Sequence, residues 1–287
     1  MKVILADVLG YCMGVRRAVE SAESALEKYS DRQVFSLGPL IHNRTALELL
    51  AGKGLGILEE KDISGITPGS VVIIRAHGVA PSVIDCLEKK ECIIINATCP
   101  RVMASQKNAR KYAALDFTII LAGDKNHGEV TGIAGYAGNS FVLLQNDEEA
   151  KDYIRTLNGE KKAVLLSQTT FSPLEFERIS KTVSSGINGV LVMNTICPAT
   201  KERQDALLSL CPQVDGVLVV GGKNSANTKR LLQTAKEHCA EAELIEAADE
   251  IPERFFSMQT VGITAGASTP DDVIKAVQKT LECGRKV

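Results

Sequence analysis

Val71-Val72-Ile73-Ile74-Arg75-Ala76-His77-Gly78-Val79 (71–79) is the stretch of this 287-residue chain that decides its fold class. An apolar run ends in a short polar loop that contains glycine, as a buried strand does at the carboxyl end of a parallel sheet. The apolar runs at 163–166 and 261–263 end in similar polar loops. Helix-like patterns separate such runs, so we predict βαβ units and an α/β fold with mainly parallel sheets.

Three cysteines each stand immediately before a helix-like segment. Cys12, Cys99 and Cys197 are 87 and 98 residues apart. Pro100 and Pro198 occupy the first helical position, where proline has no N–H to leave unpaired. The positive end of a helix stabilises a thiolate, the form that binds metal. We therefore interpret the three cysteines as ligands of one metal site to which three parts of the chain contribute.

Two polar loops follow each of these cysteines. The first comes 28 to 30 residues later and is marked by His42, His127 or Ser225. The second ends an apolar run and is marked by His77, Thr169 or Ser268. Because parallel sheets place such loops beyond the carboxyl ends of their strands, we expect six loops and three cysteines around one centre. The repeat predicts three α/β domains, 1–95, 96–194 and 195–287.

The loops favour a small polyanion as ligand. Imidazoles and hydroxyls next to glycines are good phosphate donors, especially with backbone N–H groups at helix starts. The sequence has neither the Gly-x₄-Gly-Lys-[Ser/Thr] loop nor the Gly-x-Gly-x-x-Gly motif after a strand, so ATP and dinucleotides have no standard binding loop. Glu129 is an acid within one of the loops.

Composition excludes several classes of protein. The formal net charge of −2 offers no electrostatic footprint for nucleic acid. The apolar runs are too short to cross a bilayer, and the first residues lack a signal peptide. We therefore expect a cytoplasmic protein with neither a membrane nor a nucleic-acid partner. The other five cysteines are expected to be ordinary small hydrophobic residues; they are Cys86, Cys92, Cys211, Cys239 and Cys283.

Several metal sites are compatible with three cysteines. A structural zinc site with three cysteines and a histidine usually contains a short Cys-x₂₋₄-Cys pair, which these three lack. A [4Fe-4S] cluster normally has four cysteine ligands, so three would leave one iron open for catalysis. An iron–sulfur sensor and a zinc hydrolase with Glu129 as base remain alternatives.

Eight motifs in order resemble the 4-hydroxy-3-methylbut-2-enyl diphosphate reductases, the IspH/LytB family of isoprenoid biosynthesis, over essentially the whole chain. They are Gly-Tyr-Cys-x-Gly-Val (10–15), Gly-Pro-Leu-Ile-His-Asn (38–43), Arg-Ala-His-Gly-Val (75–79), Ala-Thr-Cys-Pro (97–100), His-Gly-Glu-Val (127–130), Ser-Gln-Thr-Thr (167–170), Lys-Asn-Ser-x-Asn (223–227) and Thr-Ala-Gly-Ala-Ser (264–268). Each motif alone is weak evidence for the resemblance, but the occurrence of all eight in order is strong evidence.

The resemblance implies a trefoil of three α/β domains around a [4Fe-4S] cluster held by Cys12, Cys99 and Cys197. It implies an oxidoreductase that converts (E)-4-hydroxy-3-methylbut-2-enyl diphosphate into isopentenyl and dimethylallyl diphosphates, the last step of the methylerythritol phosphate pathway. Electrons would come from a ferredoxin or flavodoxin and protons by way of Glu129, with Thr169 at the substrate hydroxyl. The implied ligands of the diphosphate are His42, His77, His127, Ser225, Asn227 and Ser268.

Three residues depart from the family pattern. Ala226 stands where serine is frequent, which would remove or relocate one contact to the diphosphate. Gly128 stands where proline is usual, and we expect it to loosen the loop that carries Glu129. Asn96 stands where aspartate is common, which removes a charge near the cluster.

Overall fold

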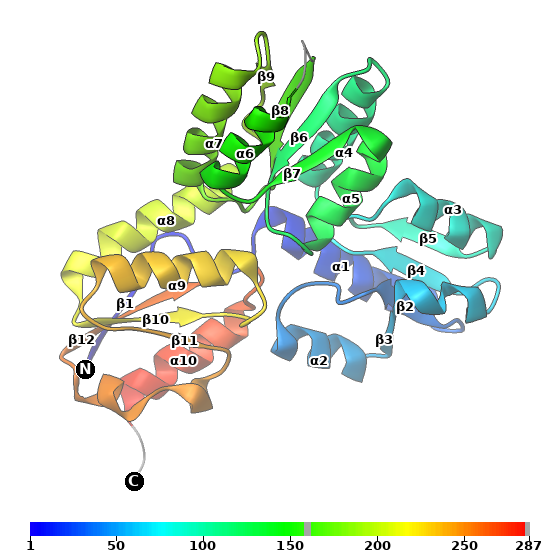
Figure 1. Cartoon of the computed structure of the whole chain (residues 1–287). Coiled ribbons are helices and arrows are strands. Elements are labelled where there is room, and N and C mark those ends of the chain that lie inside the picture. The colour runs from blue at the N-terminus through cyan, green and yellow to red at the C-terminus, as the bar shows by residue number, and fades with distance from the viewer. Residues whose placement is uncertain (158–161, 285–287) are drawn as a thin grey trace. The chain divides into compact units, whose positions relative to one another are not determined.

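Three four-stranded sheets, each accompanied by helices, form the fold of residues 1–157 and 162–284, the part of the chain that the computed structural model describes (Figure 1). This arrangement confirms the predicted α/β class with parallel sheets. The residues group into two units, which are considered separately below. Unit 1 comprises Met1–Lys28, Pro39–Gly56 and Pro198–Val287, and unit 2 comprises Tyr29–Gly38 and Ile57–Cys197.

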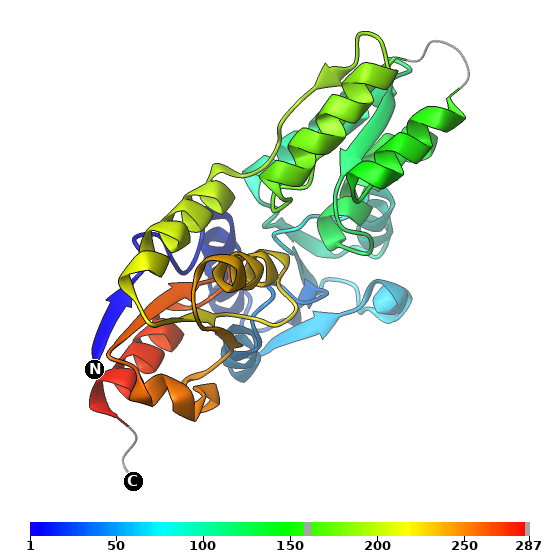
Figure 2. The same ribbon diagram turned by 60° about the vertical axis from the view of Figure 1, so that its left-hand side comes forward.

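The sheet of unit 1 has the strand order β1-β12-β10-β11, and its three pairings are parallel. Alternate residues of β10 face opposite sides of the sheet. Val217 and Val219 pack with α8 and α9, whereas Leu218 and Val220 pack with α10. Figure 2 shows the ribbon of this sheet and its helices from a second side. The elements are β1 (Lys2–Leu5), α1 (Met13–Lys28), α2 (Arg44–Gly52), α8 (Pro198–Leu210), η3 (Cys211–Gln213), β10 (Gly216–Val220), α9 (Ala226–His238), β11 (Ala242–Ile245), η4 (Ala248–Glu250), η5 (Glu253–Ser257), β12 (Thr260–Ala265) and α10 (Asp271–Cys283).

One sheet of unit 2 has the order β7-β6-β8-β9, again with parallel pairings. On β6, Ile119 and Leu121 pack with α4 and α5, and Ile120 packs on the other face with α6 and α7. Burial of each such side chain contributes roughly 2 kcal/mol to stability. The elements are α4 (Pro100–Ala113), β6 (Thr118–Ala122), α5 (Gly128–Ala137), η2 (Gly138–Ser140), β7 (Phe141–Leu144), α6 (Asp147–Thr156), β8 (Ala163–Ser167), α7 (Pro173–Gly186) and β9 (Leu191–Val192).

The remaining sheet has the order β3-β2-β4-β5, in which β4 lies between β2 and β5 and pairs with both in parallel. All four residues of β4 are buried, as expected for a central parallel strand covered on both faces. The stretch Val71–Ile74 is therefore a strand whose carboxyl end carries the loop of His77. The elements are β2 (Val34–Leu37), β3 (Leu55–Leu58), η1 (Glu60–Gly65), β4 (Val71–Ile74), α3 (Pro81–Lys89) and β5 (Ile93–Asn96).

The first strand joins a sheet that is distant from it in sequence. Residues 2–5 of β1 pair with residues 260–263 of β12. The sheet memberships thus differ from the predicted limits 1–95, 96–194 and 195–287, which grouped β1 with the residues that follow it. The tertiary fold decides which strands pair, and a short apolar run does not indicate which strand will lie beside it.

Two cysteines that we expected to be isolated hydrophobic residues form a disulfide. Cys211 in η3 is joined to Cys239 after α9, with 5.1 Å between their Cα atoms. The expectation was wrong for this pair because packing of α8 with α9 brings together residues that are 28 positions apart. Cys86, Cys92 and Cys283 are free. Among the described residues, none of the helices has the length and apolar character of a membrane span.

Candidate active site

The carboxylate of Glu129 lies at the centre of the polar residues of unit 2. It is 1% exposed and sits in the first turn of α5. The backbone N–H of Thr169 donates to its Oε1 at 2.7 Å, and the Thr169 hydroxyl donates to its Oε2 at 2.7 Å. The structure therefore brings together two predicted site residues that are 40 positions apart, one at the start of a helix and one just after strand β8.

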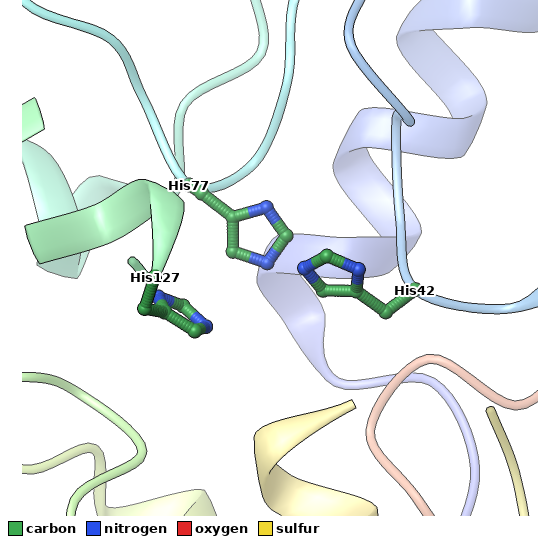
Figure 3. Close-up of side chains that lie close together, drawn as sticks. All are labelled: His42, His77 and His127. Carbon is green, nitrogen blue, oxygen red and sulfur yellow. The ribbon is translucent and has the colours of Figure 1, made fainter. Parts of the chain in front are cut away.

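His127 caps the helix that carries Glu129. Its Nδ1 accepts a hydrogen bond from the Glu129 N–H at 3.2 Å. In a neutral imidazole whose Nδ1 accepts, Nε2 carries the proton and is the donor of the ring. The ring of His77 lies 5.3 Å from the ring of His127 in an edge-on arrangement, with 89° between the planes (Figure 3). Both predicted histidines of unit 2 are thus neighbours.

The backbones of two predicted ligand cysteines are attached to these same loops. The Cys99 N–H donates to the carbonyl of Ala76 at 3.0 Å, directly beside His77, and Cys99 is the N-cap of α4. The Cys197 N–H donates to the carbonyl of Thr169 at 2.8 Å, and α8 begins at the next residue. The predicted positions of these cysteines at helix starts are confirmed.

Asparagine side chains form turns just before both cysteines. The Oδ1 of Asn96 accepts from the N–H of Thr98, and the Oδ1 of Asn194 accepts from the N–H of Ile196, each at 3.0 Å. Each asparagine lies three residues before a cysteine and makes the same local turn. An amide oxygen is sufficient for this bond, so the turn before Cys99 does not need the negative charge of an aspartate at position 96.

In unit 1, Cys12, His42 and Ser268 lie on connected loops. The Cys12 N–H donates to the carbonyl of Ala267 at 3.0 Å, and the Ser268 hydroxyl donates to the carbonyl of His42 at 3.0 Å. The Cys12 Sγ accepts from the N–H of Val15 at 3.5 Å, which places the sulfur at the amino end of α1. One backbone bond and one side-chain bond therefore link the loops that carry the three predicted residues.

The start of α9 supplies the other two predicted residues of unit 1. Ser225 is its N-cap and accepts from the N–H of Thr228 at 3.3 Å, which leaves the hydroxyl proton available to a ligand. Asn227 is 6% exposed, and its Nδ2 makes no hydrogen bond to the described residues. Ala226 is the first residue of the helix. A Cβ on Gly222 would collide with the carbonyl of His42, so only glycine permits this close approach.

Sequence reasoning missed Arg203, which is 3% exposed. Its Nη2 donates to the carbonyl of Gly10 at 2.7 Å, and its Nη1 donates to the carbonyl of Ala199 at 3.0 Å. The residue thus connects the loop of Cys12 to the first turn of α8. Its spacing of three and four residues from Ala206 and Leu207 places it on the buried face of α8, and this spacing is the signal that distinguishes it from the exposed Lys201.

Burial and neighbouring acids raise the pKa of the Tyr11 phenol, which lies next to Cys12 in sequence. Burial, with a smaller contribution from Asp271, raises the pKa of Tyr11 to about 12. The phenol is therefore protonated at any physiological pH.

The chemistry of the cysteines suits an iron–sulfur cluster. Cys12, Cys99 and Cys197 are all partly exposed, and each lies at the amino end of a helix. Soft thiolate ligands select iron–sulfur clusters, zinc or copper(I) over hard cations. The donor set fits the cluster implied by the sequence.

Known proteins match this chain over almost its whole length. The family model described as LytB protein matches residues 3–282. The 4-hydroxy-3-methylbut-2-enyl diphosphate reductase of Treponema denticola is 46% identical over 98% of this chain and 99% of its own length, and that of Thermoanaerobacter sp. is 36% identical over 98% and 96%.

Two solved structures share the fold. The reductase from Plasmodium falciparum aligns with a TM-score of 0.88 and 27% identity over 98% of this chain and 87% of its own. A second structure, of (E)-4-hydroxy-3-methyl-but-2-enyl diphosphate reductase, aligns with a TM-score of 0.74 and 35% identity over 99% and 100%. Since the match covers the segments of all three helix-start cysteines and of Glu129, the chain belongs to the LytB family.

Proposed function

We propose that this protein reduces (E)-4-hydroxy-3-methylbut-2-enyl diphosphate to isopentenyl and dimethylallyl diphosphates, the last step of the methylerythritol phosphate pathway. In this reaction the allylic C–O bond breaks, a C–H bond forms, and the hydroxyl leaves as water. The change consumes two electrons, supplied by a ferredoxin or flavodoxin, and two protons. Family membership supports the assignment, and the buried pair of Glu129 and Thr169 is the structural observation that carries it.

Cys12, Cys99 and Cys197 would hold a [4Fe-4S] cluster. When bound, this group supplies the electrons and, with only three protein ligands, one iron that is open to the substrate oxygen. The protein contributes three sulfur ligands at helix starts, and the backbone bonds of Cys99 and Cys197 position these two ligands relative to His77 and Thr169.

Glu129 and Thr169 would deliver the protons. A carboxyl group without access to water exchanges protons through a neighbouring hydroxyl, and the Thr169 hydroxyl bonds directly to Glu129 Oε2. The hydroxyl can accept a proton from the carboxylic acid and donate one to the departing hydroxyl of the substrate. Removal of bulk water from this site prevents wasteful proton loss.

The remaining predicted residues would bind the diphosphate. The donors that we assign to it include the Nε2–H of His127, the Nδ2 of Asn227 and the hydroxyl of Ser225. His42, His77 and Ser268 complete the proposed set. These neutral donors contact the diphosphate, so they do not distinguish one hydrocarbon chain from another. The Glu129–Thr169 pair would therefore select the allylic alcohol.

Anaerobic purification followed by metal and sulfide analysis tests the cofactor, and turnover with a reduced viologen dye tests the reaction. We expect a brown protein that contains iron and acid-labile sulfide and that forms both five-carbon diphosphates. A colourless protein with stoichiometric zinc would favour a hydrolase and contradict the proposal. An iron–sulfur protein that leaves the allylic diphosphate unchanged would point to a sensor.

A further inference from the structure

The side chain of Arg75 lies between two glycines at the carboxyl end of β4. A Cβ on Gly38 would collide with Arg75 Nη1, and a Cβ on Gly128 would lie 3.1 Å from Nη2 and 3.4 Å from Cζ and Nε. Gly38 also has a positive φ of +67°, which other residues rarely adopt. Both glycines therefore leave room that the guanidinium fills.

This guanidinium is largely buried and has few hydrogen-bonding partners. The side chain is 19% exposed, and Nε is buried without a hydrogen bond to the described residues. Its carboxylate neighbour is Glu60, 3.7 Å from Nη2 and itself 47% exposed. An ion pair this long and this accessible to water contributes little, so it compensates only part of the charge.

The location of the cation is electrostatically unusual. Gly128 is the first residue of α5, and the amino end of a helix already carries a partial positive charge. His127 directly precedes Gly128, His77 lies two residues after Arg75, and the rings of these two histidines are in contact. The carboxylate of Glu129, in the first turn of the same helix, bonds to Thr169 through both oxygens, and Glu60 is largely in water, so a further anion would stabilise the cation beside this helix start. The arrangement is thus suited to a ligand with high negative charge.

We propose that Arg75 is a positioning residue of the diphosphate site, an inference that rests on the proposed function. Its permanent charge attracts the diphosphate to His77 and His127. Its packing against Gly128 holds the peptide between His127 and Glu129, so that the histidine donor and the buried acid keep their relative positions. Arg75 therefore acts mainly on binding of the anion rather than on the chemical step.

Binding of inorganic pyrophosphate to the cluster-loaded protein, measured by calorimetry at several salt concentrations, tests this inference. The variants are Arg75→Met, which removes the charge, and Arg75→Lys, which keeps it. Arg155→Met is the matched control, because Arg155 is a 72% exposed arginine on α6 in the same unit. Steady-state KM and kcat for the allylic diphosphate are measured on the same samples.

We expect Arg75→Met to weaken pyrophosphate binding by about 10-fold and to make it less dependent on salt, since a charge-assisted interaction is lost. KM should rise in parallel while kcat falls by less than about threefold, and Arg75→Lys should retain most of the affinity because it keeps the charge. The control should match the wild type.

Unchanged pyrophosphate affinity in Arg75→Met, or absence of pyrophosphate binding by the wild type, would overturn the inference. Equal loss of affinity in both variants together with a lower Tm would also overturn it, because packing alone would then explain the residue. If the wild type binds pyrophosphate as expected but does not reduce the allylic diphosphate, the proposed function fails and the role of Arg75 in anion binding stands.

Discussion

At the scale of single residues, two hydrogen bonds from Thr169 hold the Glu129 carboxylate, and an amide side chain can take part in similar bonds. In Glu129→Gln, the side-chain oxygen can still accept from the Thr169 N–H, and the new NH₂ can donate to the Thr169 hydroxyl once that hydroxyl rotates. The fold should therefore survive, whereas a glutamine has no acidic proton to deliver. The substitution separates the structural role of the side chain from its proposed chemical role.

We expect Glu129→Gln to keep its iron and sulfide and to bind the substrate, while kcat falls by a factor on the order of 100 or more, the range for loss of a general acid. Glu177→Gln on α7 is the control, since Glu177 is a 62% exposed carboxylate that pairs with Lys181. Turnover of the Glu129 variant within a few-fold of the wild type would remove this residue from the proton path.

At the scale of elements, the Cys211–Cys239 disulfide connects the end of α8 to the end of α9. These two helices start at the segments of Cys197 and Ser225, so the cross-link lies far along each helix from the proposed chemistry. Its sequence separation of 28 residues closes a loop of moderate size. Loops of this size correspond to about 3 kcal/mol of stability in the chain-entropy account.

We expect Cys211→Ala combined with Cys239→Ala to lower the free energy of unfolding by about 3 kcal/mol, measured by urea denaturation without reductant. Added dithiothreitol should destabilise the wild type and leave the double variant unaffected. The control combines Cys86→Ser with Cys283→Ser, two exposed free thiols. An intact mass showing both residues as thiols in the unreduced protein would refute this prediction.

At the scale of the whole molecule, the three proposed cluster ligands come from distant parts of the sequence, since Cys12, Cys99 and Cys197 are 87 and 98 residues apart. A cluster held by three thiolates has no spare protein ligand. We therefore expect Cys12→Ser, Cys99→Ser and Cys197→Ser each to lose most of the iron and sulfide that the anaerobically purified wild type contains.

Cys86→Ser provides the comparison, because Cys86 is an exposed free cysteine on α3 and should leave the metal content unchanged. Iron and sulfide are measured by colorimetric assay on samples purified in parallel. Full iron content in any one of the three ligand variants would show that the substituted cysteine is not a ligand.

The departures from the family pattern show how local expectations compare with structure. The loosening expected from Gly128 remains a prediction, but Glu129 is anchored from elsewhere, by Thr169 and by the cap of His127. At Asn96 the amide makes the turn bond itself. A contact 40 residues away thus supports the loop at position 128, whereas a local turn bond supports the one at position 96.

The sequence by itself determined which segments are strands and helices and which loops carry chemistry. Strand runs such as Val71–Ile74 and helix starts such as those at Cys99 and Cys197 follow from apolar patterning and proline position, which act over a few residues. The family motifs added the chemical identity of the site.

Only the tertiary structure decided which of these pieces are neighbours. It placed β1 beside β12, joined Cys211 to Cys239, set Thr169 against Glu129 and seated Arg75 over Gly128. Each of these contacts joins residues at least 28 positions apart. Packing of whole elements and the loss of water around buried polar groups decide which residues make such contacts. Neither effect leaves a pattern in residues that are adjacent in sequence.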